Sequence, residues 1–152
     1  MKLDSTPYSP EGQRRIISML KKLPLFAGLH DHEFVHLCEL CNGKTYQEND
    51  YVFQQGDHSH SLFVLLSGKV NLSIAGNCSL YEALPGDFFG EIGFITQGLR
   101  AATAQAMTDS VIMEISNGDY HLLLGQQPRI NAIMMLHIAE NLAGHLLRAN
   151  KN

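Results

Sequence analysis

Residues 88–104 read FFGEIGFITQGLRAATA, a largely apolar, glycine-punctuated stretch that carries one acid, Glu91, and one base, Arg100. This composition suits a short turn or helix start whose exposed backbone N–H groups face an anion. Gly90 lets a ligand approach the backbone closely, Glu91 can accept hydrogen bonds from sugar hydroxyls, and Arg100 offers a planar fork of donors that matches a phosphate. The stretch therefore predicts an anion-binding turn.

Short β-rich runs lie on both sides of this stretch, from residue 44 to residue 115, with turn residues about every eight to twelve positions. Pairs such as Gly56-Asp57, Ser67-Gly68 and Pro85-Gly86 mark the turns. This spacing is typical of a sandwich or a jelly-roll barrel, and the only helix expected inside it is the short turn near residues 90–95. The expected strands are 45–46, 51–54, 62–66, 69–74, 79–84, 103–106 and 111–115.

Helices are expected before the β-rich region, in residues 1–43. Ser9 offers an N-cap, Pro10 a first helical position and Glu11 an acid in the first turn, so a helix should run from there to about residue 22. Asp31 can cap a second helix, which Gly43 ends.

Two further helices are expected in residues 116–152, and the second has a wide apolar face. A cap over 116–119 precedes a short helix over about 120–124, and Pro128 opens a long helix to about Ala149. Its apolar positions cover about half of the circumference, which is more than one contact needs. We expect part of this face to cover the barrel and part to contact a second copy in a homodimer. The apolar positions are Ala132, Met135, Leu136, Ile138, Ala139, Leu142, Ala143, Leu146 and Leu147.

Length, charge and hydropathy exclude several classes of function. At 152 residues with 45% apolar residues, the chain is long enough for one domain, residues 1–152, with its own core. A formal charge of −4 with 11 lysines and arginines does not provide the basic face that DNA binding needs. No apolar run approaches the roughly 20 residues that span a bilayer, and residues 1–12 do not resemble a signal peptide. We therefore expect a cytoplasmic protein without direct DNA or membrane binding.

Metal chemistry and catalysis are not indicated. Cys38 and Cys41 form a CxxC pair, but iron–sulfur and zinc sites need four such ligands and only Cys78 remains, so packing in the core is favoured. His58 and His60 resemble the metal motif of cupins, which share the jelly-roll architecture, but no glutamate follows at the required distance. We interpret both histidines as exposed turn residues. No triad or carboxylate pair stands out, so we expect no enzyme and no cofactor, and a cupin-like metalloenzyme is the least favoured function.

Three ordered motifs resemble the cyclic nucleotide-binding domains of the Crp/Fnr family and of protein kinase A regulatory subunits. Residues 23–29, LPLFAGL, are similar to the helical segment that leads into the barrel of these domains. Gly56-Asp57 followed by LFVLLSGKV at 62–70 is similar to a barrel hairpin of the family. Gly90-Glu91-Ile92 with Arg100-Ala101-Ala102-Thr103 at this spacing is similar to its phosphate-binding cassette. The resemblance covers residues 23 to 148, most of the chain.

The resemblance implies a β-roll, a jelly-roll-like barrel flanked by helices, and a cyclic mononucleotide as ligand. A cyclic phosphodiester stays anionic near pH 7 and needs a fixed cation plus oriented amides. Arg100 would supply the cation, and Glu91 would bind the ribose 2′-hydroxyl and could orient Arg100. The plainer alternative is that these two residues form a surface salt bridge on a barrel loop.

The base contacts are also implied by the resemblance. Kinase members with threonine in the place of Ala101 recruit cGMP, so alanine here favours cAMP. His145 and Leu146 stand where Crp-like members have two hydroxyl residues that contact adenine. The expected ligand-binding residues are Gly90, Glu91, Ile92, Arg100, Ala101, Ala102 and His145.

No output domain is expected in this chain. A Crp/Fnr regulator would follow the long helix with a helix-turn-helix domain, and a kinase subunit would add a pseudosubstrate segment and a second nucleotide domain. We therefore expect a cAMP-leaning sensor domain that acts through a partner protein. Two alternatives remain open: an interaction or dimerisation module with a degenerate nucleotide site, and a fragment of a Crp/Fnr-type transcription regulator.

Overall fold

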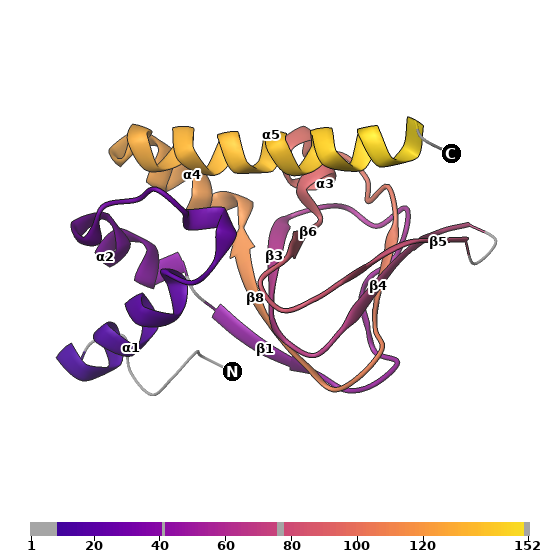
Figure 1. The fold of residues 1–152 in the computed structure, drawn as a ribbon, viewed down its shortest axis with the longest axis horizontal. Coiled ribbons are helices and arrows are strands. Elements are labelled where there is room, and N and C mark those ends of the chain that lie inside the picture. The colour runs from indigo at the N-terminus through magenta and orange to yellow at the C-terminus, as the bar shows by residue number, and fades with distance from the viewer. Residues whose placement is uncertain (1–8, 41, 76–77, 151–152) are drawn as a thin grey trace.

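The computed structural model describes residues 9–40, 42–75 and 78–150. Within these residues, eight strands form two antiparallel sheets of four strands each, in the orders β1-β8-β3-β6 and β2-β7-β4-β5. Together they make the predicted β-roll (Figure 1), so the fold class, mainly β with α, is confirmed. The strands are β1 (Asn42–Tyr46), β2 (Tyr51–Phe53), β3 (Ser61–Ser67), β4 (Val70–Ile74), β5 (Cys78–Ala83), β6 (Phe88–Phe89), β7 (Thr103–Ala106) and β8 (Ser110–Ser116).

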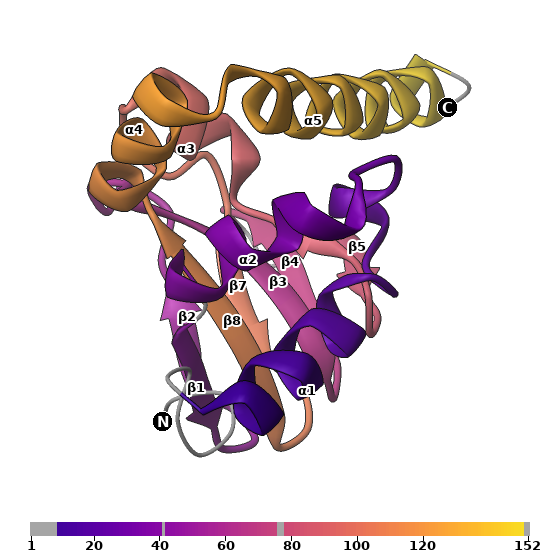
Figure 2. The same ribbon diagram turned by 90° about the vertical axis from the view of Figure 1, so that its left-hand side faces the viewer.

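Helices flank the roll at both ends of the chain. The helix α5 runs along the top of Figure 1, with the short helix α3 directly below it. Figure 2 shows α1 and α2 together on the face of the sheet that contains β3 and β8. The helical segments are α1 (Pro10–Leu20), η1 (Pro24–Phe26), η2 (Asp31–Glu33), α2 (Phe34–Leu37), η3 (Cys38–Leu40), α3 (Glu91–Thr96), α4 (Asn117–Gln126) and α5 (Pro128–Asn150), where η denotes a 3₁₀ helix.

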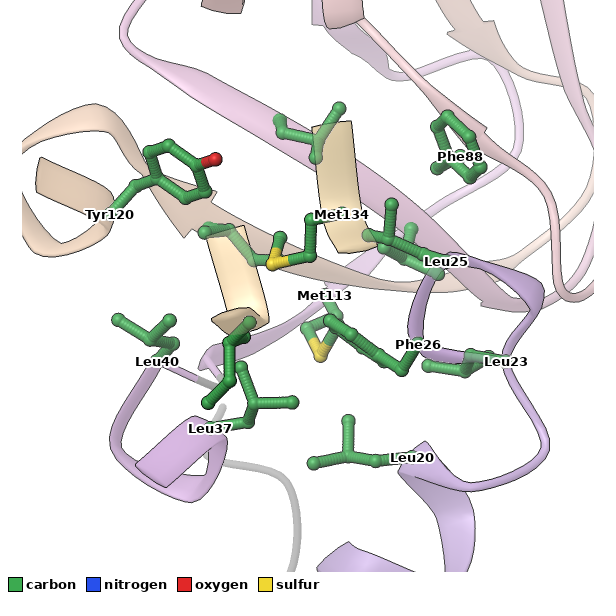
Figure 3. Close-up of a cluster of buried hydrophobic side chains, with 14 of the residues drawn as sticks. Leu20, Leu23, Leu25, Phe26, Leu37, Leu40, Phe88, Met113, Tyr120 and Met134 are labelled. Atoms are coloured by element: carbon green, nitrogen blue, oxygen red, sulfur yellow. The ribbon is translucent and has the colours of Figure 1, made fainter. Parts of the chain in front are cut away.

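Two apolar cores lie on opposite faces of the sheet formed by β1, β8, β3 and β6. Because side chains alternate along a strand, Ile112 of β8 points into the roll, whereas Met113 points to the helices. The helix-side core is shown in Figure 3, where Met113 lies among side chains such as Phe26 and Met134. The roll interior contains the aromatic side chains of Phe53, Phe63 and Phe89, together with smaller apolar residues. The second sheet contributes its apolar face to the interior of the roll.

The N-terminal segment departs from the prediction. Instead of one helix from Asp31 to Gly43, the chain forms η2, α2 and η3 in succession. The cap is His30 and not Asp31, because the Glu33 carboxylate accepts the His30 backbone N–H at 2.7 Å and completes a capping box. The segment predicted to lead into the barrel, residues 23–29, forms the single 3₁₀ turn η1.

Other local predictions have mixed outcomes. Cys38 packs in the helix-side core, as predicted, and Cys78 is exposed, whereas Cys41 lies outside the described residues. His58 and His60 are exposed, as predicted, but His58 forms an isolated β-bridge with Leu99 and neither residue lies in a turn. The strand β6 was not predicted, and α4 begins three residues earlier than expected because the Ser116 hydroxyl caps it. In the described part of the chain, no helix has the length and apolar character to cross a membrane.

The long helix α5 uses a different face from the one expected. Its fully buried residues are Ile130, Met134 and Ile138, and the first two were not assigned to the apolar face. Met135 and Leu142, which were assigned to this face, pack partly against the helix-side core. The remaining apolar positions are exposed: Ala132, Leu136, Ala139, Ala143, Leu146 and Leu147.

We predict that Ile138→Ala lowers the free energy of unfolding by about 2–4 kcal/mol, because it deletes a fully buried side chain where α5 meets the core. The matched control is Leu122→Ala on α4, where Leu122 is 69% exposed, and it should change stability by less than about 0.5 kcal/mol. Urea denaturation measures both. Equal losses for the two variants would show that α5 does not depend on this contact.

Candidate functional site

The predicted phosphate-binding stretch forms a tight turn, a short helix and a loop. Gly90 caps α3 with a backbone φ of +81°, a left-handed conformation that favours glycine. The loop after α3 is hydrogen-bonded to the turn that precedes β3. Arg100 N donates to Asp57 O at 2.7 Å, and Gly56 N donates to Arg100 O at 2.9 Å. These two bonds hold the backbone of Arg100 against the roll.

The Arg100 side chain is 5% exposed and lies among aromatic rings. Its Nη1 donates to Gly90 O at 2.9 Å and its Nη2 to Ser61 O at 2.7 Å. The Cζ atom lies 4.1 Å from the ring centroid of Phe53 and 5.4 Å from that of Phe63. The buried Nε has no hydrogen-bond partner. The guanidinium therefore uses both of its outer nitrogens on the protein, and the N–H on Nε is among the donors left available to a ligand.

Nearby acids stabilise the positive charge of Arg100. Burial lowers the pKa of Arg100, while the carboxylates of Glu114, Asp57 and Glu91 favour its charged form. An arginine guanidinium has so high an ordinary pKa that it stays protonated near neutral pH. The site therefore holds one fixed positive charge.

Glu91, the first residue of α3, is as deeply buried, with 4% of its surface exposed. Its Oε1 accepts a hydrogen bond from Asn141 Nδ2 of α5 at 3.4 Å, and its buried Oε2 has no partner. Burial raises the pKa of the Glu91 carboxyl. Neither Glu91 oxygen forms an ion pair with Arg100 among the described residues, and both side chains are buried, so the alternative of a surface salt bridge is wrong. The expected orienting contact between them is also not seen.

Glu91 and Arg100 line a cavity of about 570 Å³. It lies between the cassette, the strands β4 and β5, and the last turns of α5. All seven predicted site residues line it, whereas Leu146 is 63% exposed and does not. Figure 1 shows the C-terminal half of α5 passing above β4 and β5. The lining residues are Phe53, Leu72, Ser79, Leu80, Tyr81, Gly90, Glu91, Ile92, Gly93, Arg100, Ala101, Ala102, Leu142, His145, Arg148 and Ala149.

Among the lining residues at the α5 end that were not predicted, Tyr81 and Arg148 lie beside His145. The Tyr81 and His145 rings lie 4.4 Å apart, centroid to centroid, and join β5 to α5. Arg148 Nη2 lies 3.0 Å from His145 Nδ1, and because arginine only donates, His145 accepts through Nδ1 and carries its proton on Nε2. Burial, followed by the Arg148 charge, lowers the pKa of His145, which is consistent with a neutral ring.

Of Tyr81 and Arg148, only Arg148 could have been assigned to the site from the sequence. Arg148 is three positions after His145 on a predicted helix, so it falls on the same face. Tyr81 stands in β5, far along the chain from its ring partner His145, and no local pattern connects the two. Burial raises the pKa of Tyr81, so its hydroxyl stays protonated and can donate a hydrogen bond.

A β-roll whose glycine-capped turn presents a buried acid and a buried guanidinium to a cavity beneath a long helix has the features of a small-molecule-binding domain. The family description "Cyclic nucleotide-binding domain" matches residues 43–127, more than half of the chain. The chain therefore belongs to the cyclic nucleotide-binding domain family, as the sequence motifs predicted.

The relatives of this chain include a receptor protein and an enzyme. The chain is 31% identical over 133 residues to the cyclic AMP receptor protein of Thermus thermophilus, covering 85% of this chain and 58% of that protein. It is 30% identical over 131 residues to glutaminase 1 of Bradyrhizobium diazoefficiens, covering 86% of this chain and 21% of that protein. The chain thus spans less than two thirds of the length of these relatives.

A solved structure agrees with this assignment. The catabolite activator protein of Thermus thermophilus superposes with a TM-score of 0.72 at 30% sequence identity. The superposition covers 84% of this chain and 60% of that structure. The superposition therefore supports the fold and the family that the sequence match assigns.

Gly90→Ala should disrupt the cassette, because a Cβ there would lie 2.7 Å from Arg100 Nη1 and would be strained at a φ of +81°. We predict a loss of about 1–3 kcal/mol in the free energy of unfolding. Gly118→Ala on α4 is the matched control, since nothing lies within 4 Å of its Cβ position, and it should be neutral or stabilising by up to about 1 kcal/mol. Urea denaturation of both variants makes the comparison, and a Gly90→Ala protein as stable as the control would contradict the close packing.

Proposed function

We propose that this chain is a regulatory sensor domain that binds cAMP in the cavity beneath α5 and acts through a partner protein. The observation that carries the proposal is that one cavity collects all seven residues of the predicted site. Two of them, Glu91 and Arg100, are buried and keep one polar atom each without a partner. Buried polar atoms in native proteins are generally hydrogen-bonded, so a pair of open atoms in a cavity supports a polar ligand.

The phosphate would bind at the cassette. Arg100 supplies one charge-assisted donor through Nε, and the small side chains of Ala101 and Ala102 leave their backbone N–H groups accessible in the lining. A hydrogen bond to a charged group contributes about 1.5–3 kcal/mol. On the other side of the cavity, Glu91 Oε2 is the acceptor for a ribose 2′-hydroxyl. One ligand with a cyclic phosphate and a free 2′-hydroxyl satisfies both residues.

The base would extend toward the last turns of α5. Tyr81 and His145 provide aromatic surface there, and Leu142 adds apolar contact. Ala101 has no hydroxyl with which to hydrogen-bond a guanine, so the site favours cAMP over cGMP. The ligand would then touch both the cassette and α5, which is the contact that a sensor needs to transmit occupancy.

Calorimetric titration with cAMP tests the site directly. Arg100→Leu removes the charged partner of a desolvated phosphate, which costs about 2–5 kcal/mol, or roughly 30- to several-thousand-fold in affinity. Arg100→Lys keeps the charge but loses the planar fork, so it should weaken binding less. Glu91→Gln should weaken cAMP more than 2′-deoxy-cAMP, which lacks the hydroxyl. The control is Arg14→Leu, an exposed residue of α1 that loses the same charge.

The outcome separates the two main functions. The sensor proposal fails if the wild type gives no heat with cAMP up to millimolar concentration, or if Arg100→Leu binds as tightly as Arg14→Leu. In either case the interaction module with a degenerate site replaces it. A preference for cGMP in the same titration would overturn the base assignment alone.

We also propose a homodimer through α5, on a separate observation. The exposed positions Ala132, Leu136, Ala139, Ala143 and Leu146 alternate at spacings of four and three residues along the helix, the pattern of a coiled-coil seam. Leu142, which was expected on this seam, instead lines the cavity and packs against the core. The seam is therefore narrower than the predicted face and lies on the side of α5 away from the roll.

Charge in the seam should dissociate the dimer. We predict that Leu136→Glu with Leu146→Glu converts a dimer into a monomer in sedimentation velocity at micromolar concentration, because it places like charges in an apolar contact. Leu122→Glu is the control, since Leu122 is equally exposed but lies on α4. A wild-type monomer at high micromolar concentration, or a double variant that stays dimeric, would refute this interface.

A further inference from the structure

A chain of polar groups leads from Arg100 into the roll, away from the cavity. Arg100 Nη2 donates to the backbone oxygen of Ser61, and the Ser61 hydroxyl donates to Glu114 Oε2 at 2.5 Å. The other carboxylate oxygen of Glu114 lies 2.7 Å from Lys44 Nζ. Ser61 is 2% exposed, so the link between Arg100 and Glu114 is shielded from water. Charges interact more strongly in such surroundings than at the surface.

Glu114 occupies an interior position of β8. Side chains alternate along the strand, so Glu114 shares the face of Ile112, which belongs to the apolar interior of the roll. Its cross-strand partner is Phe63, whose ring is one of the two against the Arg100 guanidinium. Burial opposes ionisation of Glu114, but the contacts with Lys44 and Ser61 outweigh it and lower the pKa. Glu114 is therefore a carboxylate inside the roll.

The other acids near Arg100 are less suited to balance its charge. Glu91 forms no ion pair with Arg100 in the described residues, and burial raises its pKa. Asp57 is exposed to solvent, which screens it, and its Oδ2 already accepts the backbone N–H of Gln54 at 2.9 Å. The buried guanidinium needs a counter-charge, because an uncompensated charge in an apolar interior is costly. Only Glu114 faces it from within the roll among these acids.

We infer that Glu114 is the resident counter-anion of Arg100 and that it sets the affinity of the site by competing with the phosphate of the ligand. It is a positioning residue, since Ser61 lies between it and the guanidinium. The inference deepens the proposed function and rests on it for its binding test. Two anions on one cation repel each other, so the negative charge of Glu114 weakens binding of a phosphodiester. Lys44 offsets part of that charge and therefore strengthens binding.

The two members of the Glu114–Lys44 pair should act in opposite directions on cAMP affinity. Glu114→Gln keeps hydrogen-bonding atoms but removes the negative charge, and we expect cAMP to bind about 5- to 20-fold more tightly. Lys44→Met leaves Glu114 without its cation, and we expect binding about 2- to 5-fold weaker. A structural lesion would weaken binding in both variants. Calorimetry at fixed pH and low salt measures both.

An exposed ion pair provides the matched control for long-range charge effects. Lys69 Nζ and Glu82 Oε2 lie 3.7 Å apart, their side chains are 44% and 52% exposed, and neither lines the cavity. Glu82→Gln and Lys69→Met make the same charge changes and should alter cAMP affinity less than about twofold. The inference is overturned if Glu114→Gln binds cAMP no more tightly than Glu82→Gln, or if Glu114→Gln and Lys44→Met shift affinity in the same direction.

A stability cycle tests the counter-anion independently of any ligand. Glu114→Gln should lower the Tm by about 3–6 °C when Arg100 is present and by clearly less in an Arg100→Leu background, where only the lost contact with Lys44 remains, because the coupling requires both charges. If the wild type does not bind cAMP, the proposed function fails while this cycle still decides the counter-anion. Equal losses of Tm in the two backgrounds would overturn the inference.

Discussion

The burial of one guanidinium, that of Arg100, constrains the architecture of the whole site. A charge in apolar surroundings is costly unless hydrogen-bond acceptors and a counter-charge accompany it. The roll supplies the backbone oxygens of Gly90 and Ser61 and two aromatic rings. It also supplies the carboxylate of Glu114, which accepts a hydrogen bond from the Ser61 hydroxyl. The requirement also accounts for the glycine at position 90, since a side chain there would collide with Arg100. The Arg100 guanidinium therefore belongs both to the lining of the cavity and to the hydrogen-bonded interior of the roll.

The parts that the sequence predicted are those encoded by local patterns. The spacing of turns predicted a sandwich or jelly-roll barrel. The resemblance of three motifs, one of them the separation between Gly90 and Arg100, implied the β-roll and the cassette, and all of these are short-range features. The prediction missed β6, which has two residues, and it joined η2, α2 and η3 into one helix because apolar spacing does not distinguish 3₁₀ from α-helical turns. The capping role of His30 depends on a side-chain contact with Glu33 that composition does not reveal.

The contacts that give the site its properties are long-range, and a single sequence does not specify them. Ser61 precedes Arg100 by 39 residues and Glu114 by 53, so their alignment is a result of strand register. Tyr81 meets His145 only because α5 crosses above β5. The same helix carries the cavity roof on one side and an apolar seam on the other. In the proposed sensor, this single rigid element would couple ligand binding to a partner, provided that the ligand favours one position of α5.

In the proposed sensor, a ligand phosphate takes the unpaired N–H on Nε of the buried Arg100 side chain. The Arg100 Nε–H resonance in a ¹H–¹⁵N spectrum reports on this atom, and its absence from the Arg100→Lys spectrum assigns it. The account predicts that cAMP shifts this resonance saturably and in parallel with the backbone amides of Ala101 and Ala102. A spectrum in which saturating cAMP leaves the Arg100 Nε–H signal unchanged would contradict it.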